Sequence, residues 1–173
     1  MLAYVFAHRP GENVDSKTYE RALVRFHDAL AKEPPNGFVG SSSYRVAGGY
    51  SDWYLVDSSA ALDGLNAAAV SAARAPVHDM VAAMAVDGVG KLLTLVSGEQ
   101  PWGPGYEVRF AKPAGMSYPD LYRRLETWTG ERGVSLWRRM MVLGPPPEFC
   151  VVAPQMLEMP AEMRPEVLLR EPV

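Results

Sequence analysis

Two halves of the chain carry the same ordered series of features at the same intervals. In each half a Phe-Ala dipeptide followed by a proline, at Phe6–Pro10 and at Phe110–Pro113, precedes a polar stretch and a segment of helical periodicity. A glycine then opens a nine-residue interval, Gly37–Val46 and Gly133–Val142, and a further apolar run begins six residues later in both halves. A fixed order with equal intervals indicates a structural repeat. The sequence therefore predicts two tandem copies of one unit.

The first copy is predicted to contain strands at both ends, a hairpin in the middle and two helical regions. Its strand-like runs are rich in aromatic and β-branched residues and are bounded by proline or glycine. The first helix is expected to begin at Asp15 or Ser16, because apolar residues recur at helical spacing after these capping residues. The predicted strands are Leu2–His8, Phe38–Val46, Asp52–Val56 and Val89–Ser97, and the second helical region runs from Asp57 to Val86 with a new segment at Pro76.

The second copy is predicted to repeat this order with one reduction. Ser117-x-x-Asp120 resembles a capping box and is expected to begin its first helix. Only the short segment Pro154–Arg164 occupies the place of the long second helical region. The predicted strands are Tyr106–Ala111, the run from Gly133 to Val142, Glu148–Val152 and Glu166–Arg170.

The order β-α-β-β-α-β, found twice, is the ferredoxin-like motif, and the predicted fold class is α+β. Residues 1–98 form the first unit, 99–105 a linker with two prolines, and 106–173 the second unit with a shortened second helix. A chain of 173 residues suits one compact domain in which both units share a core.

Composition excludes several classes of protein and partner. A net charge of −3 argues against nucleic-acid binding, which needs a basic surface. The single cysteine, Cys150, excludes an internal disulfide and fits a reducing compartment. The apolar runs are too short for a signal peptide or a transmembrane helix, so we expect a cytoplasmic protein with no membrane partner, either a monomer or a homodimer.

This pattern of duplicated units resembles the dimeric α+β barrel superfamily. That superfamily includes cofactor-free monooxygenases of the antibiotic-biosynthesis type, haem-degrading monooxygenases and chlorite-dismutase-like haem proteins. The resemblance rests on topology and repetition and covers nearly the whole chain. It implies that the two ferredoxin-like units pair their sheets into an α+β barrel, here within one chain, with helices on the outer face and a central interior.

Strand alternation then assigns residues to the two faces of the sheet. A helix covers Tyr106, Val108 and Phe110 at lower cost than it covers Glu107 and Arg109, so the latter two are expected to face the interior. The same reasoning places Trp53 and Leu55 under helices, together with Phe149 and Val151. The residues expected to face the interior are Ser41, Ser43, Arg45, Asp52, Tyr54, Glu107, Arg109, Trp137, Arg139, Met141, Glu148 and Cys150.

These inward charges predict a small-molecule site inside the barrel. Guanidinium groups bind carboxylate or phosphate oxygens in a forked geometry, and a carboxylate beside them can act as a general base. If the protein is an enzyme, we expect cofactor-independent oxygenase-like or proton-transfer chemistry. The predicted catalytic residues are Glu107 and Glu148, and the predicted substrate-binding residues are Arg45, Tyr54, Arg109, Trp137 and Arg139. The alternative is that these charges pair with one another and only satisfy their own burial.

Two further alternatives stay open. The first is a haem protein that uses His78, because haem-degrading members of the superfamily use a helix histidine as iron ligand; the resemblance is incomplete, since the first strand has no asparagine and Trp53 is expected on the helix side. His8, His27 and His78 are otherwise expected at the surface, no metal site is predicted, and no cofactor is predicted apart from this haem alternative. The second is a non-catalytic protein with a packed barrel that serves assembly with partners.

Overall fold

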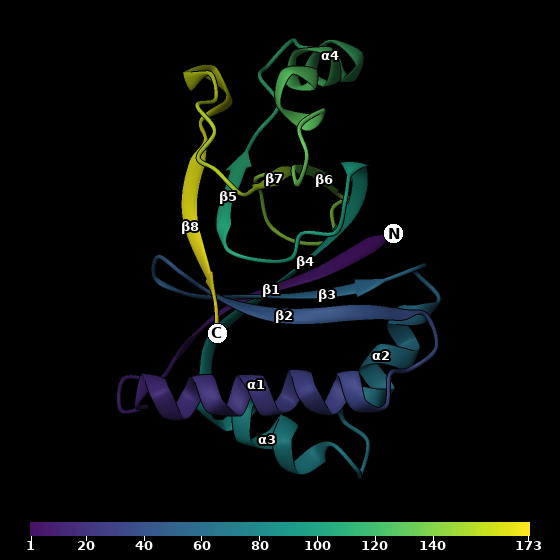
Figure 1. Cartoon of the computed structure of the whole chain (residues 1–173), viewed down its shortest axis with the longest axis vertical. Coiled ribbons are helices and arrows are strands. Elements are labelled where there is room, and N and C mark those ends of the chain that lie inside the picture. Colours follow the sequence, from purple (N-terminus) through teal and green to yellow (C-terminus); the bar gives the residue numbers. More distant parts are fainter.

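The computed structural model describes all 173 residues and confirms two tandem βαββαβ units (Figure 1). The first helix of unit one begins at Ser16, and its second helical region is split in two. The elements of this unit are β1 (Leu2–Pro10), α1 (Ser16–Lys32), β2 (Phe38–Val46), β3 (Gly49–Val56), α2 (Ala61–Ala69), α3 (Ala75–Met84) and β4 (Ala85–Gly98).

The second unit has a single α-helix. Where unit one has α2 and α3, unit two has an irregular segment with one short 3₁₀ turn, so the predicted shortening of its second helix is confirmed. The elements of this unit are β5 (Gly105–Phe110), α4 (Tyr118–Thr129), β6 (Ser135–Arg139), β7 (Phe149–Ala153), η1 (Ala161–Met163) and β8 (Glu166–Pro172).

The eight strands close into one barrel in the order β1-β3-β2-β8-β5-β7-β6-β4. Two antiparallel seams join the units. The β4–β6 seam is long and runs from Leu93↔Arg139 to Gly98↔Ser135, whereas the β2–β8 seam has only the pairs Tyr44↔Pro172 and Arg45↔Glu171. Closure of the sheet leaves both units in one body with helices at opposite ends of the view in Figure 1.

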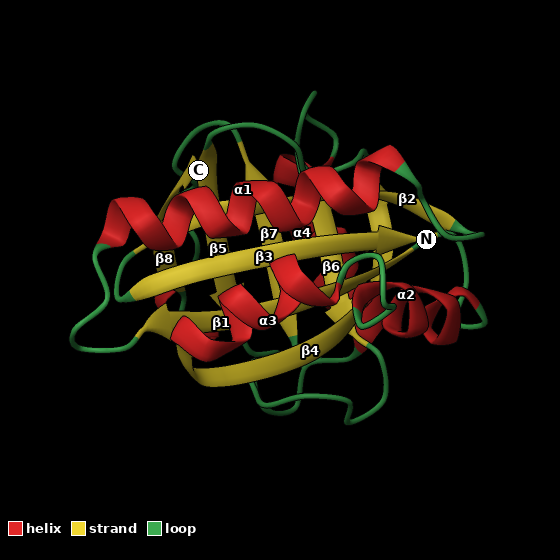
Figure 2. Ribbon diagram, turned by 90° about the horizontal axis from the view of Figure 1, so that it is seen from below, coloured by secondary structure: helices red, strands yellow, loops and turns green.

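Helix α1 lies across the outer face of the first sheet, beside α3 (Figure 2). The side chain of Asp15 caps its first turn by accepting a hydrogen bond from the backbone N–H of Thr18, as the sequence predicted. One face of the helix is buried, and its members are spaced three or four residues apart: Tyr19, Ala22, Leu23, Phe26, His27 and Leu30.

The outer face of the second sheet is covered by α4 and by the segment that contains η1. Ser117 caps α4, which places Leu121 and Leu125 against the sheet. Leu157 and Met163 of the irregular segment pack on the same cluster. The missing helix is therefore replaced by chain that buries the same apolar face. None of the helices is both long enough and apolar enough to cross a membrane.

Two predicted segments differ from the structure. The helix expected from Asp57 begins only at Ala61 and ends at Ala69, where a turn leads to α3. The run expected to reach Val142 forms a strand only to Arg139, because Met141 has a positive φ of 51° that ends the extended backbone.

Candidate functional site

The barrel interior is filled by large side chains rather than hollow. Trp53 and Trp137 contact each other edge to face across it, with ring centroids 5.5 Å apart, and both are fully buried. The cluster around them includes Tyr44, Leu55 and Cys150 together with Ala3, Val5, Leu93 and Val152. The interior is therefore a packed core that joins the two units.

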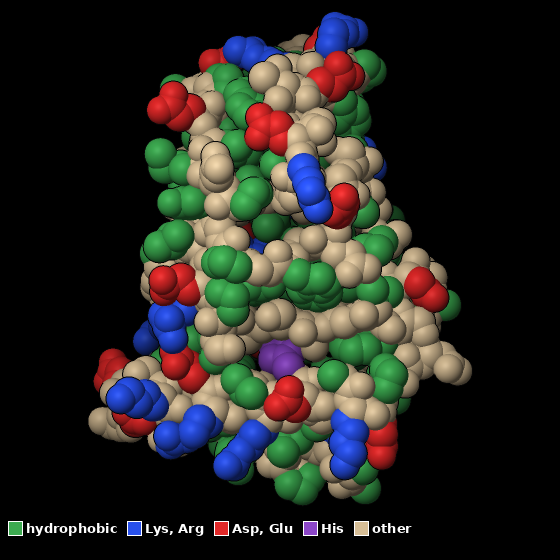
Figure 3. Space-filling view, in the orientation of Figure 1, with side chains coloured by type: hydrophobic (Ala, Val, Ile, Leu, Met, Phe, Trp, Pro, Cys, Tyr) green, Lys and Arg blue, Asp and Glu red, His purple; other side chains and the backbone are tan.

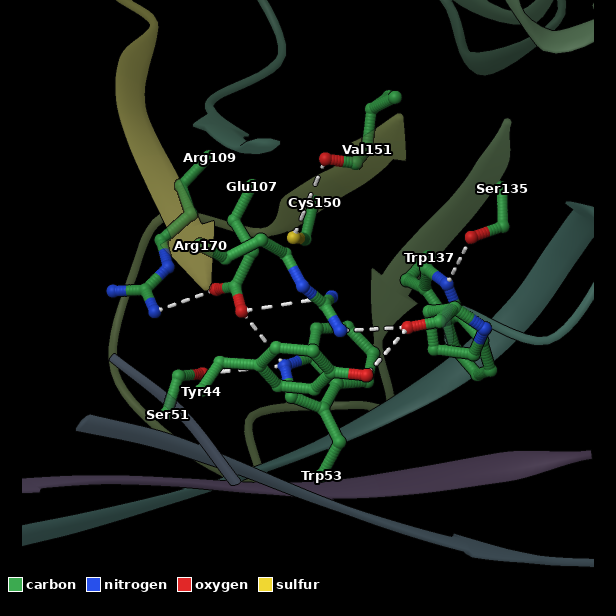
Figure 4. A network of polar contacts seen from close by, with 11 residues as sticks. Tyr44, Ser51, Trp53, Glu107, Arg109, Ser135, Trp137, Cys150, Val151 and Arg170 are labelled. Carbon is green, nitrogen blue, oxygen red and sulfur yellow. Dashed lines mark hydrogen bonds and ion pairs between the residues drawn. The ribbon is translucent and has the colours of Figure 1, made fainter. Parts of the chain in front are cut away.

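A polar network is embedded in this core (Figure 4). The Glu107 carboxylate accepts hydrogen bonds from Trp53 Nε1 at 2.8 Å and from Arg109 Nη2 at 2.8 Å, and it lies 3.8 Å from Arg170 Nη1. The guanidinium of Arg170 stacks on the ring of Tyr44, 3.3 Å from its centroid. Glu107 and Arg170 have no exposed surface, so the network pairs opposite charges that are buried together, which agrees with the alternative interpretation of these residues.

The thiol of Cys150 lies against this network. Burial, reinforced by the nearby Glu107 charge, raises the pKa of Cys150 to about 12. The nearby cations Arg109 and Arg170 act in the opposite direction but do not compensate. A thiol with such a pKa is protonated and unreactive at neutral pH.

In the second unit most of the predicted orientations are right. Glu107, Arg109, Trp137 and Cys150 face the interior, and Phe149 packs under α4 in the outer cluster. Helix α4 offers an apolar face, so the rule that a helix covers the apolar side of a strand holds here.

Three second-unit residues need separate description. Arg139 lies at the end of β6, where its Nη1 donates to the carbonyl of Gly144 at 2.8 Å. Glu148 was expected inside, but it precedes β7 and accepts a hydrogen bond from the hydroxyl of Tyr118 on α4, on the helix side. Met141 is in a loop and exposed rather than inside.

In the first unit the predicted orientations of β2 and β3 are wrong. Ser41, Arg45, Asp52 and Tyr54 lie on the helix side, where Ser41 contacts His27 and Arg45 pairs with Glu20 at 2.7 Å. The physical reason is that α1 is not wholly apolar on its buried face: it presents polar side chains that need partners on the sheet.

The inner face of these strands is correspondingly apolar. Trp53 and Leu55 occupy the barrel interior instead of lying under helices, and Tyr44 replaces its neighbours Ser43 and Arg45 as the inward residue of β2.

A cavity lies between the first sheet and the helices α1, α2 and α3, with a volume of about 820 Å³. Figure 2 shows these helices arranged over β1, β3 and β4. Thirteen of its nineteen lining residues are hydrophobic. The aromatic and aliphatic wall includes Tyr4, Phe6, Phe26, Leu30, Leu62, Leu65, Val81 and Leu92, and the polar members include His8, Asp52, Tyr54, Asn66 and His78.

Asp52 and His8 line this cavity, and a second histidine, His27, faces the same carboxylate. The carboxylate Oδ2 lies 3.1 Å from His8 Nε2 and 3.7 Å from His27 Nε2, and it accepts a hydrogen bond from the Tyr54 hydroxyl at 3.2 Å. His8, His27 and Asp52 are all buried, which overturns the expectation that the two histidines are at the surface. In Figure 3 a histidine side chain is visible between α1 and the sheet.

Each histidine is also held from its other side. His8 Nδ1 is 2.6 Å from the Tyr19 hydroxyl, and His27 Nδ1 is 2.7 Å from the Ser41 hydroxyl. Because a carboxylate only accepts hydrogen bonds, His8 Nε2 carries the proton that faces Asp52. A carboxylate–imidazole pair of this kind can bind a donor group and can exchange a proton with it.

The electrostatics of the site follow from this geometry. Burial alone would raise the pKa of Asp52, but hydrogen bonds and charge from His27 and His8 outweigh it and hold that pKa below its ordinary value. Burial and the Asp52 charge raise the pKa of Tyr54 well above its ordinary value. Asp52 is therefore an anion and Tyr54 a neutral donor at neutral pH.

His78 lines the same cavity from α3. Its Nδ1 lies 3.0 Å from Asp79 Oδ1 and its ring contacts Phe26 edge to face. The side chain is one-third exposed, so it lies at the cavity rim rather than on open surface. Trp53, the partner considered for it, is on the opposite side of the sheet.

The sequence contained a signal for the buried histidines. Tyr19, Leu23 and His27 are four residues apart on one helix, and Tyr4, Phe6 and His8 alternate on one strand face. Both spacings place a histidine in line with buried aromatic or apolar residues. Periodicity, applied to polar as well as apolar residues, finds the site.

Comparison with known proteins supports the architecture. No family model matches the sequence, and no curated protein matches it. Among solved structures, the chain is similar to a crystal structure described as that of a candidate chlorite dismutase, with a TM-score of 0.59 and 13% sequence identity. The similarity covers 99% of this chain and 94% of that chain, and at this identity it shows the fold alone.

Proposed function

We propose that this protein binds a small, largely apolar molecule in the cavity between the first sheet and helices α1, α2 and α3. The observation that carries the proposal is the combination of an apolar cavity of about 820 Å³ with a buried aspartate at one end. Ligand sites are typically clefts of this size with few, well-placed polar groups.

Burial of Asp52 supports this assignment. A buried carboxylate costs several kcal/mol of desolvation, about 3–5 kcal/mol when it lacks a partner. Here polar side chains from β1, β3 and α1 offset the desolvation of Asp52 at the wall of a cavity. Well-packed apolar side chains at the same place would give a more stable interface between the helices and the sheet. Retaining charge beside empty apolar volume is an arrangement suited to ligand recognition.

The site is thus proposed outside the barrel rather than inside it. Side chains occupy the interior, and the contacts of Glu107 and Arg109 are with protein groups. The roles predicted for Glu107, Arg109, Trp137 and Arg139 stay predictions, while Arg45 and Glu148 lie on the helix side of the sheet, away from the interior they were assigned to. Tyr54 keeps a place in the proposed site, in the cavity instead of the barrel.

A cavity-filling substitution tests the proposal. Ala69 lines the cavity from α2, and Ala67 is exposed on the same helix. We expect naphthalene, titrated by calorimetry, to bind the wild-type protein and Ala67→Phe alike. In Ala69→Phe we expect the affinity for naphthalene to fall about tenfold or more. The added ring occupies part of the cavity, and forcing extra atoms into a filled space costs about 1–3 kcal/mol. Equal binding by both variants, or no binding by the wild-type protein, would exclude a ligand site here.

Haem is a second candidate ligand, and one observation favours it. His78 lines the apolar cavity with its Nδ1 directed to Asp79, which leaves Nε2 as the nitrogen able to bind iron. The lining contains no arginine or lysine, so the cavity itself offers no cation to the haem propionates. Bound there, haem would supply redox chemistry at its iron, while the apolar walls exclude water.

Titration with haem distinguishes this candidate. If His78 binds iron, the wild-type protein develops a shifted Soret band that His78→Ala loses and Met80→Ala keeps, because Met80 is an exposed residue of the same helix. A band that is absent, or that is the same in His78→Ala, removes haem and leaves the cavity open to other ligands.

A further inference from the structure

We propose that the ligand of this cavity presents one neutral hydroxyl group, which donates a hydrogen bond to Oδ1 of Asp52. This inference rests on the proposed function and specifies the chemistry that the cavity recognises.

The two oxygens of Asp52 are in different situations. Oδ2 accepts from the Tyr54 hydroxyl at 3.2 Å and faces His8 Nε2 at 3.1 Å. Oδ1 is buried and has no hydrogen-bond partner, although its residue lines the cavity and is only 2% exposed. A buried acceptor without a donor is costly, and native proteins rarely leave one unmet. Asp52 therefore lines the cavity with a carboxylate of which one oxygen has no protein donor.

The apolar walls of the cavity favour a neutral donor over a cation. Thirteen of the nineteen lining residues are hydrophobic, and moving an ammonium group from water into such surroundings costs far more than moving a hydroxyl group. A hydroxyl group supplies the donor that Oδ1 lacks at that lower cost.

The remainder of the ligand is expected to be apolar. Phe6 and Phe26 line the cavity near Asp52, and Tyr54 contacts Phe26 with ring centroids 6.4 Å apart. Aromatic walls accept flat apolar groups with little loss of conformational entropy. The chemical class is thus an apolar alcohol or phenol.

A pair of matched probes tests the inference. 2-Naphthol and 2-methoxynaphthalene share one ring system, but only 2-naphthol can donate a hydrogen bond. Because hydrogen bonds to charged groups contribute strongly, we expect calorimetry to show 2-naphthol binding about tenfold or more tightly than its methyl ether. In Asp52→Ala this preference should disappear while the methyl ether still binds. Asp63→Ala, which removes an exposed aspartate on α2, should keep it.

The outcomes separate this inference from the proposed function. If neither probe binds the wild-type protein, both ideas fail. If both probes bind equally, or if the preference persists in folded Asp52→Ala, the cavity is a ligand site but Oδ1 is not its polar anchor. Tighter binding of 2-naphthylmethylamine, a cation at neutral pH, than of 2-naphthol would overturn the choice of a neutral donor. The comparison of the probes on the wild-type protein needs no variant. It therefore tests the preference for a hydroxyl group even if Asp52→Ala does not fold.

Discussion

At the scale of single residues, buried charge occurs in two places, in the barrel interior and on the helix side of the first sheet. Glu107 and Arg170, in the barrel interior, pair with each other and contact neighbouring aromatic groups, although Nε and Nη1 of Arg170 have no hydrogen-bond partner. Asp52, one residue before Trp53 on β3, is satisfied on one oxygen only. Both clusters leave buried polar atoms without partners, so it is the place of Asp52 in the lining of a cavity that distinguishes it and indicates a binding role.

Loss of the Glu107 carboxylate should destabilise the whole protein. Glu107→Ala leaves the guanidinium of Arg170 buried without its anion, which costs about 3–5 kcal/mol. Glu107→Gln keeps an acceptor for Trp53 Nε1 and should cost less. Urea unfolding of both variants measures the difference. A change within error of zero for Glu107→Ala would show that Arg170 finds other partners.

Stability should depend on pH through Asp52. Its pKa is lowered in the folded protein, so the folded state binds fewer protons than the unfolded chain in acid. The contribution is complete above the ordinary aspartate pKa of about 4 and is lost as pH falls below it, at up to about 1.4 kcal/mol per pH unit. Urea unfolding between pH 5 and pH 2 measures how the free energy of unfolding changes with pH. We expect this free energy to fall less steeply with decreasing pH in Asp52→Asn than in the wild-type protein, and equal pH dependence in both would contradict the prediction.

At the scale of secondary-structure elements, the two units use their helices differently. Helix α4 buries an apolar face on the second sheet, whereas α1 buries His27 together with apolar residues and faces Ser41 and Asp52 on the first sheet. The first interface therefore combines packing with a polar layer, and it encloses the cavity described above.

The cap of α4 provides a test at this scale. Ser117 accepts a hydrogen bond from the backbone N–H of Asp120 at 3.2 Å and donates to its carboxylate at 2.6 Å. Ser117→Ala should lower the free energy of unfolding by about 1 kcal/mol, because the first turn loses its acceptor. Ser117→Asp, which restores an acceptor, is the matched control. If the two variants are equally stable, the cap does not determine the stability of α4.

Much of the fold could be predicted from the sequence, because the repeat, the caps at Asp15 and Ser117 and the strand periodicity are local features. The candidate site was less accessible. The alternation of apolar and polar residues could not predict which side chains of β2 and β3 face the barrel interior. Both sides of β3 are buried, and the polar groups of Asp52 and Tyr54 are buried next to Trp53. Only the partners on β1 and α1, distant in sequence, decide which side each residue takes.

At the scale of the whole molecule, the barrel makes the two units mutually dependent. Trp53 belongs to the first unit and Trp137 to the second, and they pack on each other in the core. The predicted unit boundaries thus describe repeated topology within one shared core. A monomer or a homodimer, the predicted assembly, is distinguished by light scattering against the 19.0 kDa chain mass.

A shared core should unfold in one step. We expect tryptophan fluorescence and far-ultraviolet circular dichroism to report a single, coincident urea transition, because neither unit can bury its half of the barrel interior alone. Trp137→Phe should shift both signals together to lower urea. Two separate transitions would show that the units are independent domains.

The alternation of β3 has one further consequence. Successive residues of this strand face opposite sides, so Asp52 and Tyr54 line the cavity while Trp53, between them, touches the centre of the barrel. A molecule that binds at the carboxylate is thus one backbone step from an indole that contacts the other half of the chain. The strand places the fluorescent indole of Trp53 directly behind the proposed site. Binding of a ligand on one side of the sheet can therefore be followed by tryptophan fluorescence from the other side.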